Sequence, residues 1–371
     1  MLIKKIIYIP ILVCLVFVLS LISYSVDISA ECAVVINSVT NEIIFEKNAF
    51  KKHSMASTTK MMTSILAIES GRLGNTITVT EDALAEGSSI GLKPGYKLTL
   101  EALVYGMMLE SGNDAANVCA LSLGETFDRF SLFMNEKAED IGMANTNFVT
   151  PSGLDNEAHY STAYDMALLG AYCIKNPVFR NICSTKNKKI DFITPDISET
   201  FSNHNKLLDS CQGVFGIKTG FTKKSGRCLV SACERDGVTL VCVTLNAGDD
   251  WNDHRKLYDL SFTEINKSTV RFTDISEVSV YGADTDKTEI YCNDFVYSFK
   301  DKSKLTKQII MPKIIYAPIE KNEIIGKVNY YSDKTLVHTA YIHSKNAVSA
   351  SEERIKDKFS IVEYFQKFFQ N

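Results

Sequence analysis

Three short polar segments, far apart in the chain, carry residue types that together can perform acyl transfer. They are Ser57-Thr58-Thr59-Lys60, Ser111-Gly112-Asn113 and Lys218-Thr219-Gly220. Each alone occurs by chance in many proteins, but the three in this order form a catalytic signature. The set predicts a serine that attacks a carbonyl carbon and becomes acylated.

The first segment places a hydroxyl and an amine on one face of a predicted helix. Ser57 and Lys60 are three positions apart, and the apolar spacing predicts a helix from near Ser57 to a stop at Gly71. A serine nucleophile needs a base, and no histidine lies near enough in the sequence to suggest that role. Lys60 would serve if burial and neighbouring positive charge lower its pKa. Taken alone, the segment also suits a helix cap followed by a surface lysine.

The second segment lies between two predicted buried helices. Residues 98–109 are strongly apolar at helical spacing, with Thr99 as candidate N-cap, and helical character resumes after the tripeptide. The intervening loop would present Ser111 as a proton relay to a leaving amine and Asn113 as a partner of Lys60 and of a substrate amide. By itself the tripeptide also fits a simple helix–helix turn.

The third segment is predicted to lie on a strand beside a hairpin. Residues 226–233 and 238–245 have the composition of paired antiparallel strands, joined by a turn at residues 234–237. The strand with Lys218 would lie beside them, and Gly220 would let an extended substrate approach the sheet edge.

This strand would supply the groups that bind the substrate. Lys218 and Thr219 would meet a terminal carboxylate, and the backbone amides of Ser57 and Phe221 would stabilise an oxyanion. The plainer alternative is a lysine that protects a sheet edge from aggregation.

Longer phrases around these motifs resemble one family, the serine-type D-alanyl-D-alanine carboxypeptidases, which are low-molecular-mass penicillin-binding proteins. The resemblance runs over about residues 32–262. Its phrases are Met55-Ala56-Ser57-Thr58-Thr59-Lys60-Met61, Gly87-Ser88-Ser89-Ile90-Gly91-Leu92-Lys93-Pro94-Gly95, Ser111-Gly112-Asn113-Asp114-Ala115-Ala116, Pro151-Ser152-Gly153-Leu154-Asp155, His159-Tyr160-Ser161-Thr162-Ala163-Tyr164-Asp165-Met166 and Asn203-His204-Asn205-Lys206-Leu207-Leu208.

The resemblance implies a fold and a reaction. The fold would be the α/β penicillin-binding protein/β-lactamase-like fold, an antiparallel sheet flanked by helices, with the site at the seam of a helical subdomain. Ser57 would attack the penultimate D-Ala carbonyl of a peptidoglycan stem peptide, with Lys60 as base, and water would hydrolyse the acyl-enzyme. β-Lactams would acylate the same serine, and no metal or organic cofactor is implied. Some members hold the carboxylate with a further arginine; Arg255 is a candidate that does not align, so this role stays open.

Three rival functions remain. A β-lactamase would use the same motifs, but the sequence lacks a convincing E-x-x-x-N deacylation segment. A DD-endopeptidase that cuts cross-links shares the chemistry. A cell-wall-binding protein with a dead site is the alternative outside enzymes, and the intact motif residues argue against it.

Composition agrees with a large exported enzyme. The chain has 371 residues, 45% of them hydrophobic, and its net charge of −4 gives no indication of nucleic-acid binding. Nine cysteines follow the leader without metal-binding or redox spacing, so we interpret Cys119, Cys173, Cys228 and Cys242 as small buried hydrophobes. A Cys228–Cys242 disulfide across the hairpin stays open.

Four segments are expected along the chain. Residues 1–30 are predicted to be a signal peptide, with an uncleaved anchor as the alternative. Residues 31–265 form the catalytic domain, and residues 268–345 form a small β-rich domain. Residues 352–371 carry an aromatic amphipathic stripe predicted to bind the membrane surface, with docking on the β domain as the alternative. The protein would therefore act at the outer face of the bacterial cytoplasmic membrane or in the cell wall.

Overall fold

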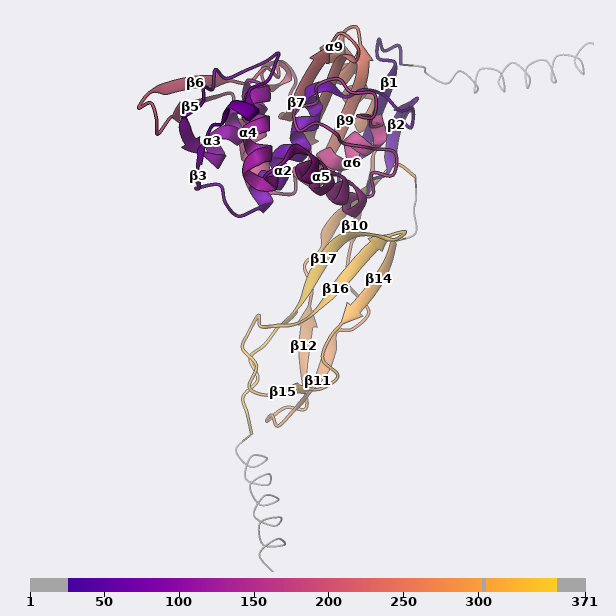
Figure 1. Ribbon diagram of the computed structural model, residues 1–371. Coiled ribbons are helices and arrows are strands. Elements are labelled where there is room, and N and C mark those ends of the chain that lie inside the picture. Colours follow the sequence, from indigo (N-terminus) through magenta and orange to yellow (C-terminus); the bar gives the residue numbers. More distant parts are fainter. Residues whose placement is uncertain (1–25, 302–304, 352–371) are drawn as a thin grey trace, which may run out of the picture.

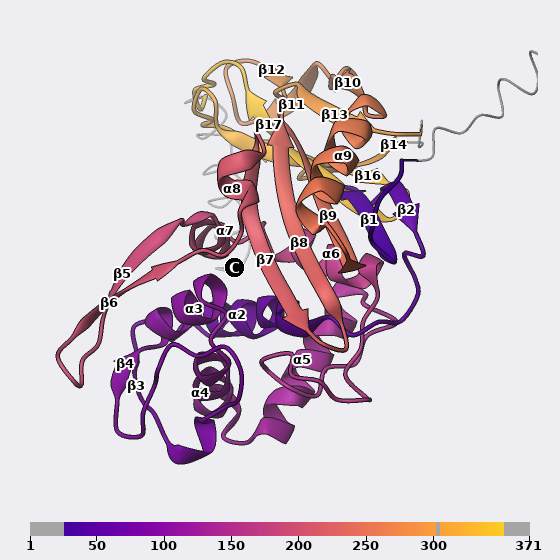
Figure 2. The same ribbon diagram turned by 90° about the horizontal axis from the view of Figure 1, so that it is seen from above.

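The computed structural model describes residues 26–301 and 305–351. Its upper part is built on a five-stranded antiparallel sheet in the order β2-β1-β9-β8-β7 (Figures 1 and 2). These strands are β1 (Cys32–Asn37), β2 (Ile43–Lys47), β7 (Val214–Thr222), β8 (Gly226–Arg235) and β9 (Val238–Ala247). The hairpin predicted around residues 234–237 is confirmed as β8 and β9, and the strand that carries the third motif is confirmed beside it.

Alternating side chains divide this sheet between two cores. In β9, Val241 and Val243 belong to the larger core with the helices, whereas Leu240 and Cys242 belong to a smaller core under α9 (Asp250–Thr263). Because side chains alternate along a strand, one apolar strand fills both layers. The strand that carries the third motif, β7, is an edge strand of this sheet.

The helical subdomain packs beside β7 and on the larger core (Figure 2). Thr99 accepts a hydrogen bond from the Ala102 amide, as expected of the predicted N-cap. The helices are η1 (Ala56–Thr59), α2 (Lys60–Glu69), η2 (Glu81–Ala83), α3 (Leu100–Leu109), α4 (Asn113–Gly124), α5 (Phe127–Ile141), α6 (Ala163–Cys173), α7 (Pro177–Ser184) and α8 (Leu207–Ser210). Two antiparallel strand pairs complete the subdomain, β3 (Thr76–Thr78) with β4 (Lys97–Thr99) and β5 (Asn187–Asp191) with β6 (Ser198–Ser202).

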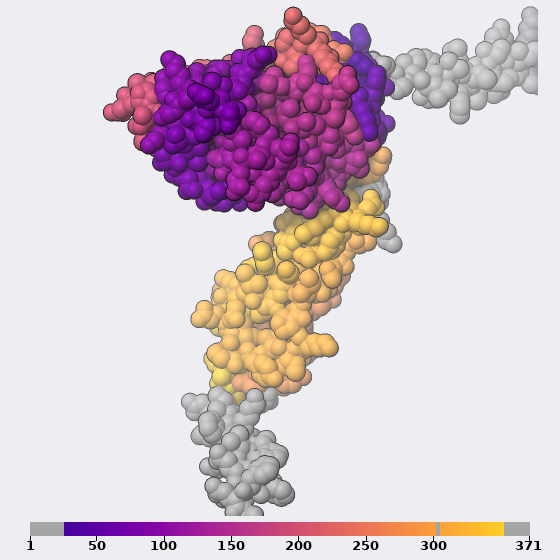
Figure 3. Space-filling model, in the orientation of Figure 1, coloured from indigo at the N-terminus to yellow at the C-terminus, as the bar shows by residue number. Residues whose placement is uncertain are grey.

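A second domain of strands extends below the first (Figures 1 and 3). Its six-stranded sheet has the order β14-β16-β17-β12-β11-β15, and β10 pairs with β13. The Glu42 carboxylate accepts hydrogen bonds from the backbone amides of Lys300 and Asp301, and these bonds join the two domains. The strands are β10 (Asn266–Val270), β11 (Glu277–Tyr281), β12 (Lys287–Tyr291), β13 (Phe295–Phe299), β14 (Leu305–Ile310), β15 (Ile315–Tyr316), β16 (Ile324–Ser332) and β17 (Thr335–Ser344).

The predicted fold class is confirmed, with an antiparallel sheet flanked by helices and a small C-terminal β domain. The predicted signal segment up to residue 25 and the predicted terminal helix at 352–371 lie outside the described residues. Across the two described ranges, no helix combines the length and hydrophobicity that a bilayer crossing requires.

The cysteines are buried thiols, as predicted. Cys119, Cys173, Cys228 and Cys242 are fully buried and free. The disulfide left open between Cys228 and Cys242 is absent from this described hairpin, because Cys242 faces Ser231 across β8 and β9.

Candidate active site

The first motif lies where the chain enters the core of the helical subdomain. Ser57 is in the 3-10 turn η1, and the α-helix α2 starts at Lys60. The predicted helix therefore begins three residues later as an α-helix, because the tighter turn precedes it. Ser57 lines a cleft of about 450 Å³, and Lys60 lies fully buried below it.

The Lys60 amine has three oxygen neighbours. Its Nζ lies 2.8 Å from Ser57 Oγ, and 2.7 Å from both Asn113 Oδ1 and the Ser152 carbonyl oxygen. Burial, and next the charge of Lys218, hold the pKa of Lys60 well below its usual value, and the charge of Asp114 acts in the opposite direction. Burial and the Lys218 charge both favour the neutral form of the amine beside the serine hydroxyl.

The second motif is the loop between α3 and α4. Ser111 has φ +62° at the end of α3, and Asn113 opens α4. The Asn113 carboxamide is fixed from both ends, because its Oδ1 faces Lys60 and its Nδ2 donates to the Glu86 carbonyl at 2.5 Å. The expected contact of Asn113 with Lys60 is present, and Ser111 lines the cleft as expected.

Asp114 fixes a covering segment over this loop. Its buried carboxylate accepts hydrogen bonds from the Ile90 and Leu92 amides and from the Ser89 hydroxyl. Ser88, beside these residues, lines the cleft, and its carbonyl accepts the Asn113 amide at 2.7 Å. The segment at residues 87–95, which carries part of the family resemblance, thus forms a wall of the site.

The third motif forms the opposite wall, on the edge strand β7. The Lys218 side chain is buried, and its Nζ donates to Ser111 Oγ at 3.1 Å and to the Thr219 carbonyl at 2.9 Å. Burial lowers the pKa of Lys218 to about 7. Thr219, Gly220 and Phe221 line the cleft itself, and Phe221 is 65% exposed there.

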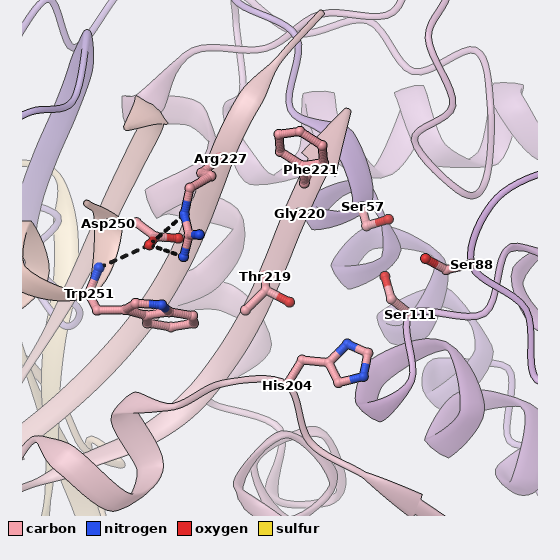
Figure 4. A pocket seen from close by; sticks show the side chains of 10 residues that line it. All are labelled: Ser57, Ser88, Ser111, His204, Thr219, Gly220, Phe221, Arg227, Asp250 and Trp251. Atoms are coloured by element: carbon pink, nitrogen blue, oxygen red, sulfur yellow. Dashed lines mark hydrogen bonds and ion pairs between the residues drawn. The ribbon is translucent and has the colours of Figure 1, made fainter. Parts of the chain in front are cut away.

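The cleft thus brings the three motifs together (Figure 4). Ser57 and Ser111 face Thr219 and Gly220 across it, while Lys60 and Lys218 lie behind this surface. Sequence reasoning predicted the catalytic-type residues, although a linear motif cannot tell which side chains are exposed and which are buried.

Arg227 is a cleft residue that the sequence did not point to. It lies on β8 opposite Phe221, and its Nε and Nη2 donate to Asp250 at 2.9 and 2.6 Å. Its guanidinium also lies 5.7 Å from the centre of the Trp251 ring (Figure 4). The sequence held one indication of this role, because Arg227 is the charged residue in an otherwise largely apolar predicted strand.

Arg255, the candidate arginine in the sequence, lies elsewhere. Its Nη1 donates to Ser210 Oγ at 3.4 Å, and it is not among the residues that line this cleft.

His204 is a further cleft residue whose role the sequence left unassigned. It lies 3.3 Å from Glu110 and lines the wall near Ser111 (Figure 4).

Comparisons with known proteins agree with this geometry. A family model described as D-alanyl-D-alanine carboxypeptidase matches residues 21–249, and one described as the penicillin-binding protein 5 C-terminal domain matches residues 266–350.

Individual relatives cover nearly the whole chain. The D-alanyl-D-alanine carboxypeptidase DacF of Bacillus subtilis is 27% identical, over 89% of this chain and 87% of its own length. DacA of Haemophilus influenzae, also named a D-alanyl-D-alanine carboxypeptidase, is 30% identical over 87% and 86%. The crystal structure of penicillin-binding protein 5 from Haemophilus influenzae superposes with a TM-score of 0.63 at 27% identity, covering 87% of this chain and 98% of that one. The resemblance predicted from the sequence is confirmed, and the chain belongs to the D-alanyl-D-alanine carboxypeptidase family.

Proposed function

We propose that this protein is a serine-type D-alanyl-D-alanine carboxypeptidase that removes the terminal D-Ala from peptidoglycan pentapeptide stems. The observation that carries the proposal is the environment of Lys60. A neutral amine donates two hydrogen bonds and accepts one, and Lys60 has two carbonyl-type oxygens and one serine hydroxyl around it. The Ser57 hydroxyl can then donate to Nζ, as a nucleophile does to its base.

Acylation follows from this arrangement. Ser57 Oγ attacks the carbonyl carbon of the penultimate D-Ala while its proton passes to Lys60 Nζ. The backbone amides of Ser57 and Phe221 donate to the oxyanion that forms. As the C–N bond breaks, the proton taken up by Lys60 passes through the Ser111 hydroxyl to the leaving D-Ala amine, which leaves Lys60 neutral again. Ser111 Oγ accepts a hydrogen bond from Lys218. Water, with Lys60 again as base, then hydrolyses the ester and restores Ser57.

The substrate carboxylate needs a cationic partner at the cleft surface. Arg227 is 42% exposed, and the two contacts with Asp250 leave its Nη1 available for a further partner. Thr219 lies on the same cleft wall (Figure 4). We propose that Arg227 and Thr219 contact the carboxylate, and that Lys218 contributes its charge from behind. Direct binding of the carboxylate by Lys218 stays a prediction.

The proposal extends to partners and location. β-Lactams would acylate Ser57 as mimics of the D-Ala-D-Ala unit. The chain would be exported, with catalytic residues 31–265, a β-rich domain at 268–345, and an apolar stripe in residues 352–371 that binds the outer face of the cytoplasmic membrane. Ser29 and Ala30 hydrogen-bond Asp253, which supports signal cleavage before the buried Ile28 rather than after Ala30.

Mass spectrometry tests the function directly. Purified ectodomain is incubated with a synthetic pentapeptide and, separately, with penicillin. We expect loss of one D-Ala from the peptide and one covalent adduct on the protein, and both should disappear in Ser57→Ala. An adduct that maps to another residue would overturn the assignment. Parallel assays on cross-linked muropeptides distinguish an endopeptidase, and rapid release of hydrolysed penicillin would indicate a β-lactamase.

A further inference from the structure

His159 is a buried residue behind the cleft that links two segments around Lys60. Its side chain is almost fully buried, and it does not line the cleft. Its Nε2 lies 2.9 Å from the hydroxyl of Thr59, the residue before Lys60. Its Nδ1 accepts the backbone amide of Val149 at 2.9 Å and, less closely, that of Thr150 at 3.3 Å.

These contacts determine the state of the ring. A backbone amide can only donate, so Nδ1 carries no proton and the neutral ring holds its proton on Nε2. The Nε2–H therefore donates to Thr59 Oγ1. Burial lowers the pKa of His159 to about 4, against the opposing charge of Asp155, so the ring is neutral at neutral pH. The imidazole thus bonds a donor-rich loop on one side and a hydroxyl on the other.

The loop that His159 holds supplies one of the three partners of Lys60. The Ser152 carbonyl accepts the hydrogen bond from Lys60 Nζ, and the Pro151 carbonyl accepts one from Thr63 of α2 at 2.6 Å. Gly153 has φ +85°, and a β-carbon there would lie 1.9 Å from the Ala56 carbonyl oxygen. This end of the loop is therefore pressed directly onto the segment that carries Ser57.

We infer that His159 is a positioning residue for Lys60, which holds the carbonyl of Ser152 against its amine. The inference rests on the proposed function of Lys60 as the base. His159 bridges the first motif, through Thr59, to the start of the loop, through the amides of Val149 and Thr150. Without this bridge the loop can move relative to α2, and the Lys60 amine loses the acceptor that keeps it directed at Ser57.

The inference predicts a loss in chemistry rather than in substrate affinity. A misplacement of about 1 Å at a reacting group can lower the rate by about 10²-fold. We expect His159→Leu to lower kcat on pentapeptide, and the second-order rate of acylation by penicillin, by about 10- to 100-fold. KM should stay within about threefold, because His159 does not touch the cleft.

Two further variants separate the halves of the bridge. His159→Asn places a carboxamide oxygen near the Nδ1 position, where it can still accept the loop amides, and should recover most of the lost rate. Thr59→Val removes only the hydroxyl partner. In the double variant Thr59→Val/His159→Leu the losses should be less than additive, because both changes break the same link.

His254 provides the matched control. It is also a fully buried histidine, with hydroxyl partners Ser231 and Thr244, and burial lowers its pKa to about 3. It belongs to α9, however, which covers the other face of the sheet. We expect His254→Leu to lower Tm while the folded fraction acylates at the wild-type rate. A wild-type rate in His159→Leu, or an equal loss in His254→Leu, would overturn the inference.

The outcomes separate this inference from the proposed function. If wild-type protein neither binds penicillin covalently nor cuts the pentapeptide, the proposed function fails. If wild-type protein is active and the His159 variants match it, only the positioning role fails. If His159→Leu does not fold, Thr59→Val and His159→Asn provide the test. A wild-type acylation rate in Thr59→Val, together with complete loss of acylation in His159→Asn, would contradict the bridge.

Discussion

Gly220 lies so close to Ser57 that a β-carbon on Gly220 would be 2.9 Å from the Ser57 amide nitrogen and 3.0 Å from that of Thr58. Both atoms belong to backbone, so neither can move aside cheaply. The third motif therefore needs glycine because β7 and the turn η1 meet there, and this contact sets the width of the proposed oxyanion site.

We expect Gly220→Ala to push β7 away from Ser57 and to lower acylation by penicillin by about 10²-fold. The measurement is the second-order rate of adduct formation, followed by intact mass. Gly74→Ala is the control, because no atom lies within 4 Å of a β-carbon there. Equal rates in the two variants would show that the close approach does not matter.

Lys218 should control the pH dependence of the reaction through Lys60. The positive charge of Lys218 is the second cause, after burial, of the lowered pKa of Lys60. Removing that charge in Lys218→Met raises the pKa of Lys60, so the amine is neutral only at higher pH. The limb of the acylation profile that rises with pH should therefore move to higher pH, in addition to any loss of rate. An unshifted limb would show that the two amines are not coupled.

Arg227 should distinguish substrates by their C-terminal charge. We expect Arg227→Ala to lower kcat/KM for a peptide ending in D-Ala, with a loss of about 2–4 kcal/mol in transition-state stabilisation, because the substrate carboxylate is left unpaired. The C-terminal amide should be affected much less. Asp250→Asn should cause a smaller loss, because it weakens the support of the guanidinium. The same comparison in Lys218→Ala shows which cation meets the carboxylate. Equal losses on acid and amide in Arg227→Ala would exclude Arg227 as that partner.

Truncation after Ser351 tests the proposed membrane segment. The cut leaves the C-terminal domain intact at its end, where the Ser351 amide donates to the Gly282 carbonyl and Ala350 pairs with Ala283. We expect the truncated, signal-free protein to be released from liposomes while its turnover of soluble pentapeptide is unchanged. Binding of the full mature chain should weaken only mildly with salt, because the segment carries little net positive charge.

Two results would contradict the membrane proposal. If the truncated protein unfolds or loses activity, residues 352–371 are a docked structural element. If the full mature protein does not bind liposomes at low salt, retention at the membrane has to come from the N-terminal segment.

The sequence by itself determined the reaction class and most of the elements. Ser57 and Lys60 are close along one turn, the α3 helix has its N-cap at Thr99, and the β8–β9 hairpin closes through a short turn. These features depend on local spacing, which a linear pattern records directly. The longer family phrases added the expected substrate.

The tertiary structure decided which of these residues face the cleft and in what state. Lys60 and Lys218 are 158 positions apart in numbering, yet folding buries both and so lowers the pKa of each amine. The charge of Lys218 lowers the pKa of Lys60 further. Arg227 replaces Arg255 as the proposed carboxylate partner because β8 pairs with β7. His159 reaches Thr59 across 100 residues. Burial and long-range contact depend on how distant segments pack, and one sequence read along its length does not contain that packing.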